Sequence, residues 1–116
     1  MTKVKMLYHN NLICGFEMEG HACYNPGGPD VICASLSAAS QMTVNGVLDA
    51  TGYDYDELVR EANAKEGILK VELDYYDIFY DAMVLVTQQL FKAFELYIVM
   101  LSEQFPDNVQ IERRGE

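Results

Sequence analysis

His21 and Cys33 stand twelve residues apart, joined by a Gly- and Pro-rich stretch that leads into the start of a predicted helix. A cysteine thiolate is a strong nucleophile, and an imidazole can take the thiol proton and later return it to a leaving group. The pair therefore contains the two groups that covalent cysteine catalysis requires. The elements around these residues decide whether the two side chains can meet.

Cys33 falls in the first turn of that helix if Asp30 caps it. Aspartate is a favoured N-cap, and the apolar residues that follow recur at three- and four-residue spacing up to Gly52, a typical glycine after a helix end. Unpaired amides and the positive end of the helix dipole favour a thiolate there. The same amides, including that of Cys33, are candidate donors to an oxyanion. The alternative is that Cys33 is a small core residue.

His21 follows directly after the second predicted strand, where a side chain is anchored yet can project into a cleft. It is the candidate general base, and Asp30 could orient its ring in addition to capping the helix. The alternatives are a surface histidine beside a glycine and an aspartate that acts only as a cap. His9 lies at a predicted hairpin turn, which makes it a poor second candidate.

The three cysteines, Cys14, Cys23 and Cys33, do not form the even-numbered framework of a secreted disulfide protein. They predict free thiols in a reducing, cytoplasmic setting. Because they lack a paired C-x-x-C knuckle and Cys14 is expected within a strand, no metal site and no cofactor are predicted. Cys23 and Cys33 could instead form a regulatory disulfide, which would make the chain a thiol redox sensor.

The hydrophobic pattern of the first half predicts two strands followed by a helix. The strands are expected at 3–9 and 12–18 around a turn at Asn10-Asn11, and a loop at 20–29 precedes a helix at 31–51.

The second half is less regular. Residues 53–73 are compatible with a helix over 57–65 or with two strands at 58–62 and 68–73. A long helix capped by Asp74 is expected to run to about Gln104, and a short strand at 109–112 and a frayed tail follow it. The pattern thus predicts one α+β domain over residues 1–116, a small two-layer arrangement of ββαββα(β) order in which a mixed sheet packs on two helices.

The long predicted helix is apolar on most of its circumference. A helix of this kind must be covered on more than one side, which favours a second subunit. Its expected core stripe consists of Phe79, Met83, Val86, Leu90, Phe94, Tyr97 and Leu101, widened by Ile78, Ala82, Leu85 and Leu96.

The chain is acidic, with 18 Asp and Glu against eight Lys and Arg and a formal net charge of −10. That charge disfavours binding to phosphate backbones, so nucleic-acid binding is not expected, and it attracts a basic partner such as a Lys- and Arg-rich peptide. An ordinary acidic surface of a soluble protein is the other explanation. Residues 1–11 lack the apolar core of a signal peptide, and no run approaches the roughly 18 apolar residues of a membrane span.

Around the candidate site the sequence resembles the ribosomal-processing cysteine protease family, called Prp. The resemblance lies in the segment 20–22 (GHA) and the segment 28–37 (GPDVICASLS). Family members have a very similar G-H-A, then G-x-D-[IV]-[VI]-C-[AS] followed by serine, with the same separation of histidine and cysteine. The layout of elements is similar over nearly the whole chain. Cys23 and Pro29 depart from the usual family residues, which puts loop mobility and redox sensitivity in doubt.

The resemblance implies a cytoplasmic, homodimeric cysteine endopeptidase that removes an N-terminal extension from a basic large-subunit ribosomal protein precursor. It also implies two strands in the ambiguous region and a mobile loop at 22–29 that orders over a bound peptide. The implied site residues are Cys33 as nucleophile, His21 as base, Asp30 as a possible helper, and Gly20, Ala22, Gly27, Gly28 and Ser37 at the substrate.

Two other functions remain compatible with the sequence. The first is a non-catalytic, acidic, ribosome-associated binding module in which Cys33 is merely buried. The second is the thiol redox sensor. Selective alkylation of Cys33 would distinguish the binding module from the other two.

Overall fold

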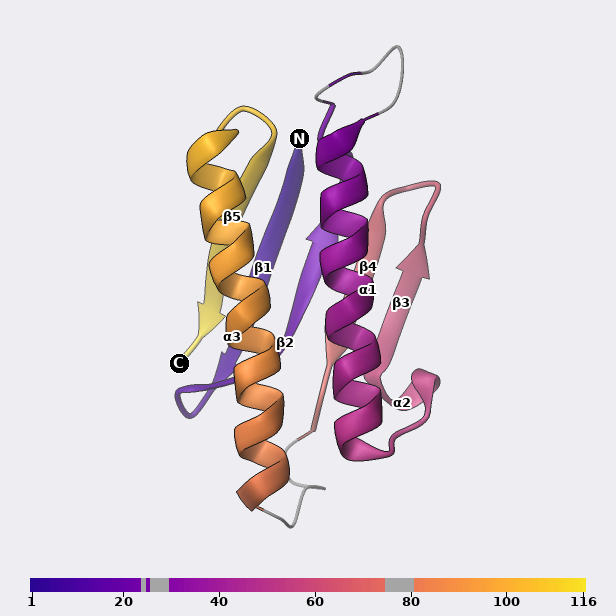
Figure 1. The fold of residues 1–116 in the computed structure, drawn as a ribbon, viewed down its shortest axis with the longest axis vertical. Coiled ribbons are helices and arrows are strands. Elements are labelled where there is room, and N and C mark those ends of the chain that lie inside the picture. The colour runs from indigo at the N-terminus through magenta and orange to yellow at the C-terminus, as the bar shows by residue number, and fades with distance from the viewer. Residues whose placement is uncertain (24, 26–29, 75–80) are drawn as a thin grey trace.

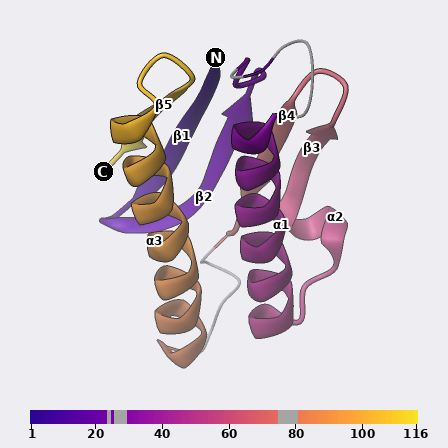
Figure 2. The same cartoon turned by 45° about the horizontal axis from the view of Figure 1, so that its top comes forward.

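The computed structural model describes residues 1–23, 25, 30–74 and 81–116. In this described part, a five-stranded sheet forms one layer and two long helices form the other (Figure 1). Figure 2 shows both helices on the same side of the sheet. The predicted α+β class, with its mixed sheet and strand and helix order, is confirmed.

The sheet begins with a hairpin of β1 (Thr2–His9) and β2 (Leu12–Glu19). Asn10 and Asn11 join the strands with φ angles of 51° and 64°. Asparagine tolerates this left-handed conformation better than most residues, and two such residues in succession match the twist of a tight hairpin. The predicted hairpin is confirmed.

Two further strands extend the sheet from β2. β3 (Val59–Asn63) and β4 (Ile68–Glu72) form a second hairpin, which gives the sheet order β3-β4-β2-β1-β5. The two-strand interpretation of the ambiguous region is therefore correct. In this region the only helix is the short α2 (Tyr55–Leu58), which ends where β3 begins.

The last strand, β5 (Val109–Gly115), pairs in parallel with β1. The expectation of a frayed tail at 113–116 was wrong, since Arg113 and Arg114 pair with Met6 and Leu7. Arg114 also forms an ion pair with Glu17 on β2, across the intervening strand β1. These cross-strand contacts extend β5 to Gly115.

The helix α1 spans Val31–Thr51, as predicted, and ends at Gly52 with a φ of 72°. The helix α3 is described from Asp81 to Gln104. Asp74, the predicted cap of this helix, lies just beyond β4, and the predicted first turns at 75–80 fall outside the described residues. In Figure 1 the two helices run in opposite directions across the sheet, so α1 begins near the end of α3.

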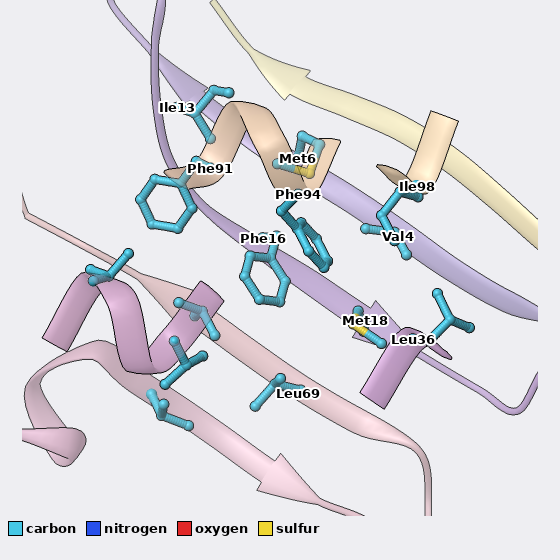
Figure 3. Close-up of a cluster of buried hydrophobic side chains, with 14 of the residues drawn as sticks. Val4, Met6, Ile13, Phe16, Met18, Leu36, Leu69, Phe91, Phe94 and Ile98 are labelled. Atoms are coloured by element: carbon cyan, nitrogen blue, oxygen red, sulfur yellow. The ribbon is translucent and has the colours of Figure 1, made fainter. Parts of the chain in front are cut away.

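The core lies between the sheet and the two helices (Figure 3). At its centre the ring of Phe16 stacks on Phe94 at 4.2 Å and meets Phe91 edge-on at 6.4 Å. Burial of three aromatic rings fixes the position of α3 over β2. The buried residues of α3 are Thr87, Phe91, Phe94, Ile98 and Leu101, so most of the predicted core stripe is displaced by one residue.

The two long helices are also apolar enough, by length and composition, to cross a membrane. The sequence expectation counted uninterrupted apolar residues, which is a stricter measure than helix length and mean hydropathy. In this structure α1 and α3 both supply side chains to the core against the sheet, and core helices of globular domains commonly have the same composition.

Gly15 provides a test of this sheet. A Cβ at Gly15 would lie 1.9 Å from the Val71 carbonyl oxygen, so a side chain there must push β2 and β4 apart. We expect Gly15→Ala to lower the free energy of unfolding by about 2–3 kcal/mol, measured by urea denaturation. The control is Gly52→Ala, which meets no atom within 4 Å and is strained only by its positive φ, at a cost of about 1 kcal/mol. An equal loss in both variants would contradict the close β2–β4 approach.

Candidate active site

Asp30 fixes the start of α1 with its side chain. Its Oδ1 atom accepts hydrogen bonds from the amides of Ile32 at 3.0 Å and Cys33 at 2.9 Å, so the predicted N-cap is confirmed. Cys33 therefore lies in the first helical turn, close to the positive end of the helix dipole. Because its amide already donates to Asp30, the expectation that this amide is a free oxyanion donor is not met in this structure.

The thiol of Cys33 is partly buried and has a backbone partner that the sequence did not predict. The amide of Ala22 donates to Cys33 Sγ at 3.3 Å. An N–H group that donates to a sulfur atom can stabilise negative charge that develops there during a reaction. It also places the loop after β2 directly against the start of α1.

His21 is held by the turn between β3 and β4. Its Nε2 atom lies 3.0 Å from the carbonyl oxygen of Lys65. A carbonyl can only accept, so in the neutral ring Nε2 must carry the proton and Nδ1 keeps the free lone pair. A backbone carbonyl thus holds the ring, and of the two ring nitrogens Nδ1 is the one that can accept a proton.

The backbone of residues 20–22 is tied to three separate parts of the fold. The amide of Gly20 donates to Gly67 O at 3.0 Å, and the Thr2 hydroxyl donates to Gly20 O at 3.3 Å. Asn108 Nδ2 donates to Ala22 O at 2.9 Å. The β3–β4 turn, the start of β1 and the connection to β5 together hold the segment that contains His21.

Gly67 makes the first of these contacts possible. It has a φ of 67°, and a Cβ there would lie 2.5 Å from the Gly20 carbonyl oxygen and 3.3 Å from the His21 ring. Only a residue without a side chain fits so close to the histidine loop. The sequence shows a glycine at position 67 but does not show that it packs against Gly20 and His21.

His21 and Cys33 line one cleft of about 400 Å³ between α1 and the β3–β4 turn. Its walls include Gly20 and, one turn along α1, Ser37, which is exposed. The top of Figure 2 shows the elements that surround it. No hydrogen bond joins His21 to Cys33 among the described residues, so proton transfer requires the two side chains to approach each other, as catalytic contacts often do on substrate binding. The predicted site residues Gly27 and Gly28 lie outside the described residues.

A larger cleft of about 740 Å³ lies at the other end of the sheet and contains Cys14. Burial, together with the nearby charge of Glu72, raises the pKa of the Cys14 thiol above its ordinary value. Cys14 Sγ lies 3.5 Å from the Leu7 carbonyl oxygen, within the sheet. This cleft also contains His9, but burial disfavours the thiolate of Cys14, so it is the weaker candidate for covalent cysteine catalysis. Within the described part of the chain, no three His, Cys, Asp or Glu residues are grouped to hold a metal ion.

The whole fold is similar to those of solved proteins that include a protease. The crystal structure of the essential ribosomal processing protease Prp from S. aureus with a covalently linked product peptide has a TM-score of 0.80 at 19% identity, covering 98% of this chain and 100% of that one. The same protease with a substrate peptide gives 0.75 at 17%, with 98% and 100% covered. The SMU.848 protein from Streptococcus mutans gives 0.76 at 24%, with 100% and 96% covered.

At these identities the structural likeness establishes the fold, and no curated protein gives a significant sequence match. Sequence membership comes from a family profile described as cysteine protease Prp, which matches residues 1–110. Because that match extends over almost the whole chain, the protein belongs to the cysteine protease Prp family and is a cysteine-type peptidase.

Proposed function

We propose that this peptidase removes the N-terminal extension of a large-subunit ribosomal protein in the cytoplasm, with Cys33 as nucleophile and His21 as base. The observation that carries the proposal is the shared cleft, in which an amide donates to Cys33 Sγ and His21 is held with Nδ1 free. The similar S. aureus protease is described as a ribosomal processing enzyme and was crystallised with a substrate peptide and with a covalently linked product peptide.

The proposed reaction proceeds in two steps. His21 Nδ1 takes the Cys33 proton, and the thiolate attacks the scissile carbonyl carbon to form a tetrahedral oxyanion. The imidazolium then protonates the leaving amine, which leaves the extension as an acyl-thioester on Cys33. Water, deprotonated by His21, hydrolyses the thioester and restores both side chains. Asp30 contributes by holding the first turn of α1, and Ser37 lies along the cleft where a peptide would run.

The charge of the chain suits a basic substrate. With a formal net charge of −10, the protein attracts Lys- and Arg-rich segments at a distance. Ribosomal proteins bind RNA and are commonly basic, so their precursors belong to the class of partner that this surface favours. The lining of the cleft includes the apolar side chains of Met18, Leu36 and Leu69, which suit uncharged substrate side chains next to the scissile bond.

The first test is cleavage of a peptide that spans the extension and the first residues of the mature ribosomal protein, followed by mass spectrometry. We expect Cys33→Ala to lower kcat/KM by at least about a thousandfold, because no other group can form the acyl-enzyme. His21→Ala is expected to lower it by about a hundredfold or more, since a general base is lost.

Matched controls are Cys14→Ala and His9→Ala, which change the same residue types at the far cleft and at the β1–β2 turn. Both are expected to cleave at the wild-type rate when folded. Binding of the peptide without cleavage by the wild type would contradict the proposal and favour the non-catalytic binding module.

Thiol reactivity gives a second test that does not depend on the substrate. The raised pKa of Cys14 means that less of its thiolate is present at neutral pH, so iodoacetamide should modify Cys14 more slowly than a free thiol. Cys33 should be modified faster than a free thiol, because the helix start and the Ala22 amide favour its thiolate. Both rates are read from peptide masses in one reaction. Equal rates at Cys14 and Cys33 would contradict an activated nucleophile.

We further propose that the enzyme is a homodimer that covers the outer side of α1 and α3. Leu85, Leu96 and Met42 are 67–72% exposed there, and an apolar groove of about 540 Å³ runs between the helices. We expect Leu96→Glu to halve the mass measured by light scattering, because a charge cannot be buried in such an interface. Gln110→Glu, on β5 in the sheet layer, is the control and should leave the mass unchanged. A monomeric wild type would contradict the dimer.

A further inference from the structure

Asn108 connects the two ends of the chain to the segment that contains His21. It lies between α3 and β5, where its amide donates to Phe105 O at 3.0 Å and its carbonyl accepts from the Thr2 amide at 2.9 Å. Its side chain is partly buried and donates from Nδ2 to Ala22 O at 2.9 Å, across 86 residues of sequence. The backbone contacts need no particular side chain, whereas the contact to Ala22 requires a side-chain donor.

The contact to Ala22 restrains a backbone that would otherwise relax. Cys23 has a φ of 56°, a left-handed conformation that side chains with a Cβ rarely adopt outside turns. Such a residue persists only where its surroundings hold it. The Ala22 carbonyl belongs to the peptide group that leads into Cys23, so Asn108 fixes the orientation of this peptide group.

Ala22 also donates its own amide to the sulfur of Cys33, the proposed nucleophile. The Ala22 methyl group is fully buried in the core, its carbonyl is held by Asn108, and its amide donates to Cys33 Sγ at 3.3 Å. With the side chain and the carbonyl both fixed, the direction of the N–H bond is fixed as well. If the carbonyl is released, the strained conformation at Cys23 can relax and turn the N–H away from the sulfur.

We propose that Asn108 is a positioning residue of the active site, which aims the Ala22 amide at the sulfur of Cys33 and so maintains its thiolate. This inference rests on the proposed role of Cys33 as nucleophile. Asn108 does not itself touch the reacting atoms. Its effect passes through one hydrogen bond to a carbonyl and a second from the adjacent amide to the sulfur.

The sharpest variant is Asn108→Asp, which keeps the size and shape of the side chain but cannot donate a hydrogen bond when ionised. Asn45→Asp is the matched control, since it makes the same chemical change at an exposed position of α1. Asn108→Ala is the second variant and removes the donor without adding charge. The measurements are the rate of Cys33 alkylation against pH, kcat and KM for the peptide substrate, and the melting temperature.

We expect both Asn108 variants to slow Cys33 alkylation at neutral pH by about tenfold, the effect of losing one hydrogen bond to a charged sulfur. The rate at high pH, where every thiol is ionised, should equal that of the wild type. kcat should fall by a similar factor while KM changes little, and Asn45→Asp should match the wild type throughout.

A purely structural role would lower the melting temperature and leave the pH profile of Cys33 alkylation unchanged, which would overturn the proposal. Unchanged alkylation together with unchanged kcat would overturn it too. The proposed function fails separately. If Asn108→Asp slows alkylation but the wild type does not cleave the ribosomal peptide, the positioning role stands and the substrate assignment falls.

Discussion

The peptide groups of residues 20–22 leave the sheet at the end of β2, yet they still require hydrogen-bond partners, and the site depends on how these are supplied. A buried peptide group without a partner costs a substantial part of the stability of a small domain. Here the partners come from the β3–β4 turn, the start of β1, the connection to β5 and the thiol of Cys33. The hydrogen bonds that satisfy the backbone of residues 20–22 therefore also hold His21 at the same cleft as Cys33.

The groups in contact with Cys33 present positive partial charge, whereas the chain as a whole has a negative net charge. A formal charge of −10 disfavours any further anion, including a thiolate. The start of α1 offsets this locally, since a helix N-terminus stabilises a nearby negative charge by about 0.3–1 kcal/mol. The Ala22 amide adds a directed donor at 3.3 Å, and the Asp30 carboxylate, although itself negative, is engaged by the amides of Ile32 and Cys33. Salt screens distant exposed charges, whereas these contacts act on the sulfur at short range.

Much of the layout could be predicted because its signals are local. The hairpin follows from Asn10-Asn11, and the bounds of α1 follow from Asp30 and Gly52. The buried face of α3 could not be predicted, because a helix that is apolar all round has no single face of greatest hydrophobicity. The sequence placed Val86 and Leu90 in the core, whereas Thr87 and Phe91 are buried there.

The same distinction applies to the site. His21, Cys33 and Asp30 were identified from residue types and spacing, which chemistry constrains. The Lys65 carbonyl could not be identified, since every residue has one and the contact spans 44 positions. The amide of Ala22 and the side chain of Asn108 are likewise visible only once the chain is folded. The predicted strand at 109–112 was too short. β5 pairs in parallel with β1, and parallel neighbours are not joined by a tight turn whose residues would indicate the length of the strand.

The parallel pairing of β1 with β5 has a consequence for the timing of activity. The proposed nucleophile and base both lie within the first 33 residues, but β5, the strand that follows Asn108, is the last described element along the chain. Contacts between distant parts of a chain form late, since the loop between them must close first. With Cys33 in its proposed role, a nascent chain contains the nucleophile before Asn108 can hold the Ala22 amide toward its sulfur. We therefore expect peptide cleavage to begin only after the two ends of the polypeptide have come side by side.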